Sequence, residues 1–243
     1  MSEYQSNNAQ VASNPFQASA LIFFKPKAVF DALFNRDNWS WVPFFMLSIV
    51  LFMPGYMFFK VVDFDYWVSI FVQIQSPGAS PKELENAAAG FFPLQMQFSY
   101  ALLGVLATLM INLVIAAYYS FITRNDEKSI HSYSDWFGAM WWCAMPSLLS
   151  GLLSILLISL YEPNVQTFGE VMMPLSVAFF AGIDPLSAWY SLAGTLRIDY
   201  IWSVFLGFVL LRSWTEFALT KAAVLASIPF VLAIVYNVIV AMF

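Results

Sequence analysis

The sequence predicts an all-α, multi-pass membrane bundle of five transmembrane helices, with an N-terminal amphipathic helix and an interfacial or re-entrant helix near residues 171–183. Of the 243 residues, 60% are hydrophobic and only 10% are charged, whereas about a quarter of the residues in a soluble domain are charged. Aromatic residues make up 19% of the chain, and the mean hydropathy is +0.71. Apolar segments long enough to cross a bilayer as helices recur along the chain.

Residues 1–19 are expected to form a disordered polar tail ahead of a membrane domain at residues 20–243. The tail is rich in Ser, Asn and Gln, and it lacks the basic start and apolar core of a secretory signal peptide. Pro26 then stands at the first turn of a short helix. Apolar and polar residues take opposite faces of this helix, which is typical of a helix lying in the membrane surface and equally of one docked on the protein's own bundle. The candidate surface-binding residues are Lys25, Lys27, Phe30 and Phe34.

Five apolar segments are expected to cross the membrane. Trp39 and Trp41 introduce the first at the level of the lipid headgroups, and Pro54 is expected to kink it. After this span, Ser80 and Glu83 predict a capped helix outside the bilayer. The predicted spans lie at about residues 41–59, 96–122, 136–161, 198–214 and 222–243.

The segment between the third and fourth predicted spans needs a different arrangement. Residues 171–183 are apolar but too few to span a bilayer comfortably. They contain Pro174 and are bounded by Glu170 and Asp184. We therefore expect an interfacial or re-entrant helix, whose backbone must be covered by protein wherever it enters the lipid.

The distribution of basic residues predicts the orientation, because cytoplasmic loops carry an excess of Lys and Arg. With five spans and a cytoplasmic N-terminus, most of the ten basic residues face the cytoplasm. The C-terminus then lies on the opposite side, and the net charge of −5 belongs to that outer face. The basic residues assigned to the cytoplasm are Lys25, Lys27, Arg36, Arg124, Lys128, Arg212 and Lys221, and those assigned to the outer side are Lys60, Lys82 and Arg197.

The residue types that carry chemistry are scarce. A negative net charge argues against nucleic-acid binding, which needs a basic face. A single cysteine, Cys143, excludes an intrachain disulfide and a cysteine-clustered metal site. The only histidine, His131, lies on a short polar loop, where a solvated role with Ser132 or Ser134 capping the next helix is favoured over a metal or proton site. We expect no enzymatic activity and no cofactor, because no nucleophile has a recognisable base partner.

Polar residues within the predicted spans are candidate functional residues, because burying a polar group unpaired costs on the order of a few kcal/mol. Asn112 and Asn237 lie in the second and fifth spans, and they are expected to hydrogen-bond neighbouring helices rather than a substrate. Asp199 begins the fourth span beside Arg197. Helix capping is favoured for this carboxylate, with a place at the mouth of a groove as the alternative.

Charged residues also cluster where the fourth and fifth spans meet the cytoplasm. Arg212, Glu216 and Lys221 lie close together in the sequence there. They are expected to pair with each other or to bind anionic lipid headgroups.

Four short motifs follow one another in the second half of the chain, namely Tyr-Ser-Asp-Trp-Phe at 133–137, Ala-Met-Pro-Ser-Leu-Leu at 144–149, Ile-Asp-Tyr-Ile-Trp-Ser at 198–203 and Thr-Lys-Ala-Ala at 220–223. This ordered set resembles the Yip1 domain family of five-span membrane proteins. The resemblance implies a five-helix fold with a cytoplasmic N-terminus, in agreement with the distribution of basic residues. Eukaryotic relatives bind Rab-type GTPases in vesicle traffic, but the short N-terminal tail is more similar to the bacterial branch, which implies a bacterial inner membrane.

The leading functional hypothesis is a non-enzymatic inner-membrane protein of Yip1 type. It acts by oligomerisation, with itself or other membrane proteins, and by recruitment of partner proteins or lipids. The alternative is an oligomeric transporter or channel for a lipid, an amphipathic solute or an ion, which the acidic outer face and the segment around Pro174 suggest. An integral-membrane enzyme is the third and least favoured class.

Overall fold

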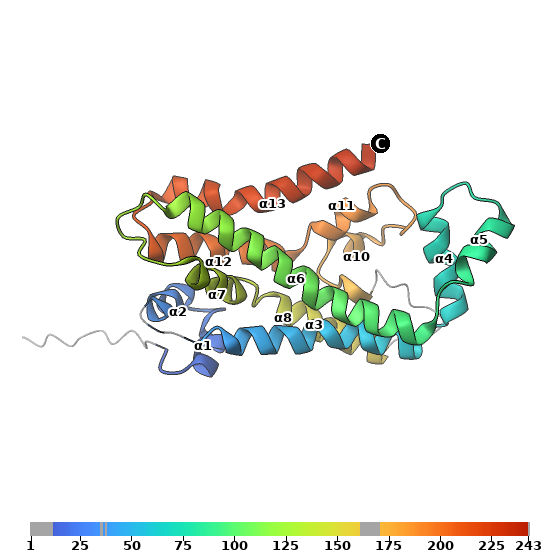
Figure 1. The fold of residues 1–243 in the computed structure, drawn as a ribbon, viewed down its shortest axis with the longest axis horizontal. Coiled ribbons are helices and arrows are strands. Elements are labelled where there is room, and N and C mark those ends of the chain that lie inside the picture. Colours follow the sequence, from blue (N-terminus) through green and yellow to red (C-terminus); the bar gives the residue numbers. More distant parts are fainter. Residues whose placement is uncertain (1–11, 35, 37, 161–170, 243) are drawn as a thin grey trace, which may run out of the picture. The chain divides into compact units, whose positions relative to one another are not determined.

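The structure is a computed structural model that describes residues 12–34, 36, 38–160 and 171–242. Within these ranges every regular element is a helix, apart from an isolated antiparallel bridge between Ser176 and Arg197 (Figure 1). The predicted all-α class is therefore confirmed. The helices are α1 (Pro15–Leu21), α2 (Pro26–Leu33), α3 (Trp41–Val61), α4 (Phe64–Gln75), α5 (Pro81–Ala88), α6 (Pro93–Thr123), α7 (Tyr133–Cys143), α8 (Ser147–Leu160), α10 (Val177–Ala181), α11 (Tyr190–Thr195), α12 (Ile198–Trp214) and α13 (Leu219–Met242).

Three of the described helices, α3, α6 and α13, are long and apolar enough to cross a membrane. The helices α7 and α8 form a fourth candidate if they are counted as one span, although they are bent by 43° at the break between them. Helix α12 has 17 residues, which is at the lower length limit for a span. Helices therefore occupy all five predicted segments, and three or four of them meet the length and hydropathy required of a span.

The predicted third span at 136–161 differs from the structure, which breaks it into α7 and α8. Pro146 lies in the break, directly before α8. Proline lacks a backbone N–H and its ring clashes with the preceding turn, so it interrupts a helix that the apolar pattern alone would continue. By contrast, α3 continues through Pro54.

The structure also differs from the helix expected over 171–183. Helix α10 covers only Val177–Ala181. Ser176 caps its start by accepting a hydrogen bond from the Phe179 N–H at 3.1 Å, and Gly182 ends it in a left-handed conformation with φ of 58°. Pro174 lies in the turn before the cap, where its missing donor is tolerated. Glu170, which bounds the predicted helix, lies outside the described residues.

Part of the expected disordered tail is helical. Helix α1 begins at Pro15, and Asn14 caps it by accepting a hydrogen bond from the Gln17 N–H at 2.9 Å. The difference from the sequence-based expectation covers residues 15–19, because a helix of only seven residues is too short to show a clear apolar periodicity and depends on its cap. Residues 1–11 lie outside the described residues.

The chain divides into two compact units. Unit 1 comprises Met1–Phe45, Asn112–Met145 and Ser203–Ile228, and unit 2 comprises Met46–Ile111, Pro146–Trp202 and Pro229–Phe243. Every basic residue assigned to the cytoplasm belongs to unit 1, whereas Lys60, Lys82 and Arg197 belong to unit 2. The packing of the chain and the topology expected from its charges therefore sort the basic residues in the same way.

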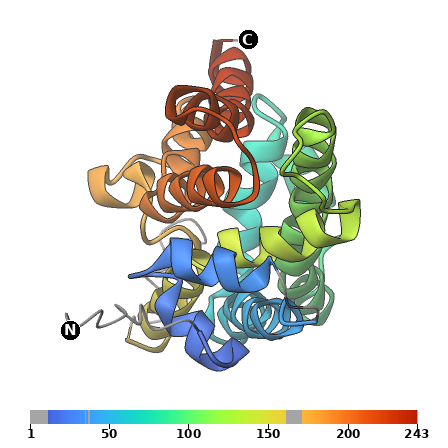
Figure 2. The ribbon, with the colours of Figure 1, turned by 90° about the vertical axis from the view of Figure 1, so that its left-hand side faces the viewer.

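Unit 1 has a core rich in tryptophan. The indoles of Trp136, Trp141 and Trp142 are almost completely buried, and the Trp142 Nε1–H donates to the Ser40 hydroxyl at 3.2 Å. The N-terminal helices α1 and α2, the loop after α6 and the turn before α13 lie together at one end of this unit (Figures 1 and 2). That end presents the residues of the candidate site.

Unit 2 is held by close helix approach. A Cβ on Gly55 of α3 would lie 2.8 Å from the backbone N of Ala101 in α6, and one on Gly151 of α8 would lie 2.4 Å from Val50 of α3. Small residues allow such contacts between apolar helices. Beyond these contacts lies an apolar cluster made by α3, α4, α6 and α8 together with the start of the 171–183 segment, namely Phe58, Phe59, Trp67, Val68, Val72, Met96, Ile158 and Val171.

Candidate functional site

The most elaborate arrangement of side chains in unit 1 is the contact between α2 and the ends of α7 and α12. We call it the α2 dock and define it by Phe30, Phe34, His131, Trp136 and Trp214. Phe30 is completely buried and Trp214 is 2% exposed. The dock joins the N-terminal segment to residues about 100 or more positions later in the chain, so it is a tertiary feature and not a local one.

Hydrogen bonding and ring stacking hold α2 in the dock. The Trp214 Nε1–H donates to the Phe30 backbone carbonyl at 3.0 Å. The His131 ring stacks on Trp214 with a centroid distance of 3.8 Å and an interplanar angle of 29°. The Phe34 ring meets His131 edge-on at 4.6 Å. Such aromatic contacts contribute about 0.5–1.5 kcal/mol each beyond the area they bury.

Two polar atoms of the dock are buried without a hydrogen-bond partner among the described residues, namely His131 Nε2 and Trp136 Nε1. Burial lowers the pKa of the His131 imidazole below its ordinary value, and the negative charge of Asp135 opposes this shift without cancelling it. The surroundings of the ring therefore favour the neutral imidazole over the protonated one. Ser132 meets Asp135 at the start of α7, since its backbone N–H donates to the carboxylate at 2.8 Å, in keeping with the expected capping role of this loop.

The structure has α2 docked on the protein, which is one of the two arrangements expected from its sequence. Val29, Phe30, Ala32 and Leu33 are buried. Lys25 and Lys27 are exposed, and Lys27 pairs with Asp31 at 2.5 Å on the outer side of the helix. An exposed pair of this kind adds little stability. Both lysines are therefore accessible to another molecule while the apolar face of α2 is occupied.

The residues at the turn between α12 and α13 do not pair with each other in the structure. Arg212 donates a hydrogen bond to the Phe217 carbonyl, and the Lys221 ammonium lies 3.6 Å from the centre of the Phe217 ring. The Glu216 backbone N–H donates to the two carboxylate oxygens of Asp126 at 3.2 and 3.0 Å. Asp126 thus ties the loop after α6 to this turn. Both Arg212 and Lys221 are exposed, so contact with lipid headgroups stays a prediction.

Asp199 is the buried carboxylate of unit 2. Its side chain is 1% exposed and pairs with Arg197, whose side chain is 12% exposed. The Arg197 Nε–H donates to one carboxylate oxygen at 2.9 Å, and an Nη2–H donates to the other at 2.7 Å. A second Nη2–H donates to the Ser150 hydroxyl of α8 at 2.6 Å. The pair fixes the start of α12 against α8, a partner that no sequence spacing predicts.

The Arg197 guanidinium keeps its charge in this setting. Burial favours the neutral form, but the Tyr200 side chain and the hydrogen-bonded Asp199 carboxylate together hold the pKa of Arg197 above its ordinary value. The guanidinium carbon also lies 4.5 Å from the centre of the Tyr200 ring. A two-pronged pair of this kind is the strong form of a charged hydrogen bond.

The two asparagines do not form the expected bonds to neighbouring helices. The Asn237 side-chain N–H donates to the Ala233 carbonyl of its own helix at 2.8 Å. Asn112 is 5% exposed, and its Nδ2 finds no partner within the part of the chain that the structure describes. Asn112 shares a face of α6 with the buried Ala116, Tyr119 and Thr123, because these positions are spaced by three and four residues.

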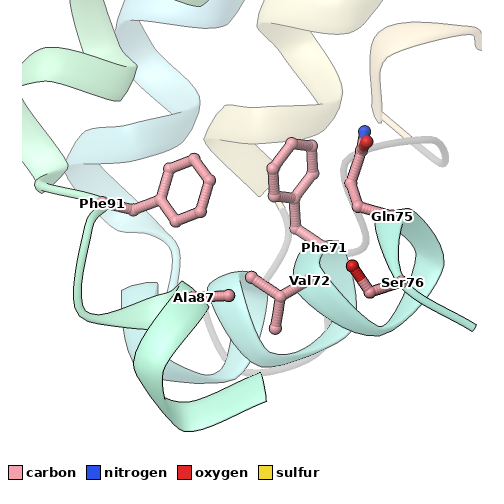
Figure 3. Close-up of a pocket in the computed structure, with 6 residues that line it drawn as sticks. All are labelled: Phe71, Val72, Gln75, Ser76, Ala87 and Phe91. Atoms are coloured by element: carbon pink, nitrogen blue, oxygen red, sulfur yellow. The ribbon is translucent and has the colours of Figure 1, made fainter. Parts of the chain in front are cut away.

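The described residues contain no group of three or more His, Cys, Asp or Glu side chains that could hold a metal ion. An open pocket of about 260 Å³ lies between α4 and α5 in unit 2. Figure 3 shows the rings of Phe71 and Phe91 flanking it, with Val72 and Ala87 between them and the polar Gln75 and Ser76 to one side. The lining is mostly apolar and offers no charged side chain.

Sequence analysis missed the role of His131. Its place on a polar loop favoured solvation, but the ring is half-buried between α2 and α12. The partners that bury it, Phe34 and Trp214, lie about 100 positions before it and about 80 positions after it. No local sequence pattern predicts such contacts. The only available signal for this loop was that its single histidine precedes a tryptophan-rich helix.

The three or four helices that are long and apolar enough to cross a bilayer are those of a multi-pass α-helical membrane protein. The chain belongs to the Yip1 domain family, since residues 20–240 match that family. The resemblance of the four motifs is thereby confirmed. Searches of curated proteins and of solved structures found no match.

Proposed function

We propose that this protein is a non-enzymatic scaffold of a bacterial inner membrane, which oligomerises and recruits partner proteins or lipids through its cytoplasmic end. Five spans place the N-terminus in the cytoplasm and the C-terminus in the periplasm. In this arrangement α7 with α8 forms the third span and α12 the fourth. No cofactor and no nucleic acid takes part.

The observation that carries recruitment is the docked state of α2. A binding element works best when it is held rigidly, because less conformational entropy is then lost when a partner binds. The dock fixes α2 through Phe30 while it leaves Lys25 and Lys27 exposed. Anionic lipid headgroups or an acidic protein surface are the chemistry that these lysines fit.

Oligomerisation is supported by helices that bury little of their apolar surface. In the most apolar 18-residue stretch of α13, only 6% is buried. In the corresponding stretch of α6, 17% is buried. Lipid or a second copy must cover these faces. Cross-linking of the full chain in lipid nanodiscs tests the idea: discrete dimers or higher species are expected, and a product that stays monomeric at every protein-to-lipid ratio would refute oligomerisation.

The test of recruitment reverses the charge of the exposed lysines. A Lys25→Glu/Lys27→Glu variant leaves the apolar face of α2 intact, unlike deletion of residues 20–36. Lys82→Glu, on the exposed α5 of unit 2, is the matched control. Quantitative affinity capture from native membranes should lose specific proteins or anionic lipids with the double variant and retain them with the control. Identical capture by all three proteins would remove the support for recruitment through α2.

A transporter or channel is the second candidate, and the buried Arg197–Asp199 pair is the observation that favours it. Ionisable residues inside a membrane bundle commonly mark a substrate or ion path. Flux of ions and lipid probes through liposomes that contain the protein tests this function. Flux above that of empty liposomes, lost in an Arg197→Met/Asp199→Leu variant, is expected of a transporter. Flux equal to that of empty liposomes would exclude it for the probes used.

A further inference from the structure

The α2 dock places an ionisable ring at the contact that holds the N-terminal segment. His131 lies between Phe34, which follows α2, and Trp214, which ends α12. Its Nε2 atom is buried and has no hydrogen-bond partner among the described residues. The indole Nε1–H of Trp136, whose ring lies 6.1 Å from His131, is a second buried atom in the same condition.

The chemistry of these two atoms favours a neutral imidazole. In the neutral ring one nitrogen accepts and the other donates, whereas both donate after protonation. A protonated His131 would leave a buried Nε2–H donor without an acceptor, in addition to the unpaired donor of Trp136, and it would place a positive charge on a half-buried ring. A buried charge without a paired acceptor is costly. The docked arrangement therefore discriminates against the protonated form.

The surrounding charges do not reverse this preference. Asp135 is the charged group whose field acts on the ring, and its carboxylate is already engaged by Ser132. On α2, the pair between Lys27 and Asp31 lies on the exposed side. The remaining charged groups among the described residues of these elements are Lys25 and Arg36 beside α2, Arg124, Asp126, Glu127 and Lys128 on the loop that carries His131, Asp199 and Arg212 on α12, and Glu216 in the turn after α12.

We propose that α2 is a pH-sensitive latch, which stays on the dock while His131 is neutral and moves to the membrane surface when His131 is protonated. Released α2 would lay Val29, Phe30 and Phe34 on the lipid, as the face pattern of its sequence also predicts. The latch rests on the proposed function, because it regulates the element that is proposed to recruit partners.

The direction of the pH effect follows from linkage. The pKa of His131 is lowered from its ordinary value of 6.5 in the docked state. At pH values between the lowered pKa and 6.5, the released protein therefore binds more protons than the docked protein. Docking is therefore strongest above about pH 6.5 and weakens as the pH falls through the lowered value. Each pKa unit of lowering corresponds to a tenfold change in the docking equilibrium constant.

A distance measurement on the full chain in lipid nanodiscs tests the latch. Lys25→Cys on the N-terminal side of α2 and Lys128→Cys on the loop after α6 carry spin labels, since both positions are exposed in unit 1. The native Cys143 is buried and escapes labelling. Pulsed electron paramagnetic resonance should give one narrow distance at pH 8 and a second, longer population that grows between pH 6.5 and 5.

Three variants separate titration of His131 from other effects of acid. His131→Phe keeps an aromatic ring without a titrating group, and His131→Asn serves as a second non-titrating variant if the phenyl ring disturbs the fold. Both should lose the transition. Asp135→Asn should shift it to lower pH, because the charge that favours protonation is removed. A constant distance in the parent protein from pH 8 to 5, or the same transition in both non-titrating variants, would overturn the latch.

The latch and the proposed function fail in different ways. If the distance between the spin labels changes with pH but capture of partners at pH 8 does not depend on Lys25 and Lys27, the latch stands and recruitment through α2 falls. If capture depends on these lysines but the distance does not change with pH, recruitment stands and the latch falls.

Discussion

Arg197 and Asp199 show how a chain with few ionisable residues handles a buried charge. All the oxygen atoms of the carboxylate and two of the three guanidinium nitrogens are in hydrogen bonds, and Ser150 supplies a further acceptor. A pair this well satisfied need not add net stability over an apolar replacement, but removing one partner leaves the other charge buried and alone. Replacing one of the two residues should therefore cost more stability than replacing both with apolar residues.

Substitution of Asp199 by alanine should destabilise the protein by about 3–5 kcal/mol, because the guanidinium of Arg197 loses its counter-charge. An Arg197→Met/Asp199→Leu double variant should recover most of this loss. The free energy of unfolding in mixed detergent micelles is the measurement. Asp31→Ala breaks the exposed pair with Lys27 and is the matched control, which should leave the free energy unchanged within error. Equal stability of the Asp199→Ala variant and the parent would contradict this account of the pair.

The sequence predicted the position of Asp199 but not its whole environment. Arg197 and Asp199 are two residues apart, so their proximity was expected, and the position at the start of a helix favoured a cap. Ser150, which completes the site, is 47 positions away on α8. A single sequence carries no signal for such a contact, because any serine in an apolar helix fits the same pattern.

At the scale of helices, packing depends on where a side chain is missing. Helix α3 meets α6 at Gly55 and α8 at Gly151, and a methyl group at either place would strike its neighbour. Apolar helices in lipid gain little from hydrophobic burial against each other, so close approach and dispersion must hold them together. Glycine is used at these positions for its size.

Gly55→Ala should destabilise unit 2 by about 1–3 kcal/mol, because its Cβ would lie 2.8 Å from backbone atoms of α6 that have no rotamer to adjust. Gly90→Ala is the matched control, since its Cβ would meet only the Ala87 carbonyl at 3.5 Å. Thermal unfolding in detergent should show a lower midpoint for the first variant alone. A parent-like midpoint for Gly55→Ala would mean that α3 and α6 separate easily.

The segments that were predicted well are those that no break divides. The segments at 41–59, 96–122, 198–214 and, as far as residue 242, 222–243 each lie within one continuous helix. The structure departs from one continuous helix where proline or glycine acts against the apolar run, as at Pro146 between α7 and α8 and at Pro174 and Gly182 on either side of α10. The average hydropathy of about 20 residues hardly changes when one of them is a proline. The helix itself is interrupted, because proline lacks a backbone N–H.

At the scale of the whole molecule, the ten basic residues sort with the two units. Seven belong to unit 1 and three to unit 2, and this is also the division that a cytoplasmic N-terminus requires. The compact units follow from backbone packing alone, so their agreement with the predicted orientation is not imposed by charge.

Single-cysteine labelling tests the proposed orientation. Lys128→Cys in unit 1 should react in intact cells only after the inner membrane is made permeable, and Lys82→Cys in unit 2 should react as soon as the outer membrane is opened. A membrane-impermeant maleimide is the probe, and the buried Cys143 of the parent protein provides the unlabelled control. Labelling of the two positions in the opposite order would invert the topology.

The hydrogen bond between Trp214 and Phe30 joins residues that are 184 positions apart. A ribosome that makes the chain from its N-terminus delivers α2 long before the indole that will hold it. At about 5–20 residues per second, α2 waits on the order of ten seconds or more with its apolar face unoccupied, while the spans between are inserted. The lipid surface offers such a face a place to rest until Trp214 has been made, and the dock then joins two segments that are synthesised far apart in time.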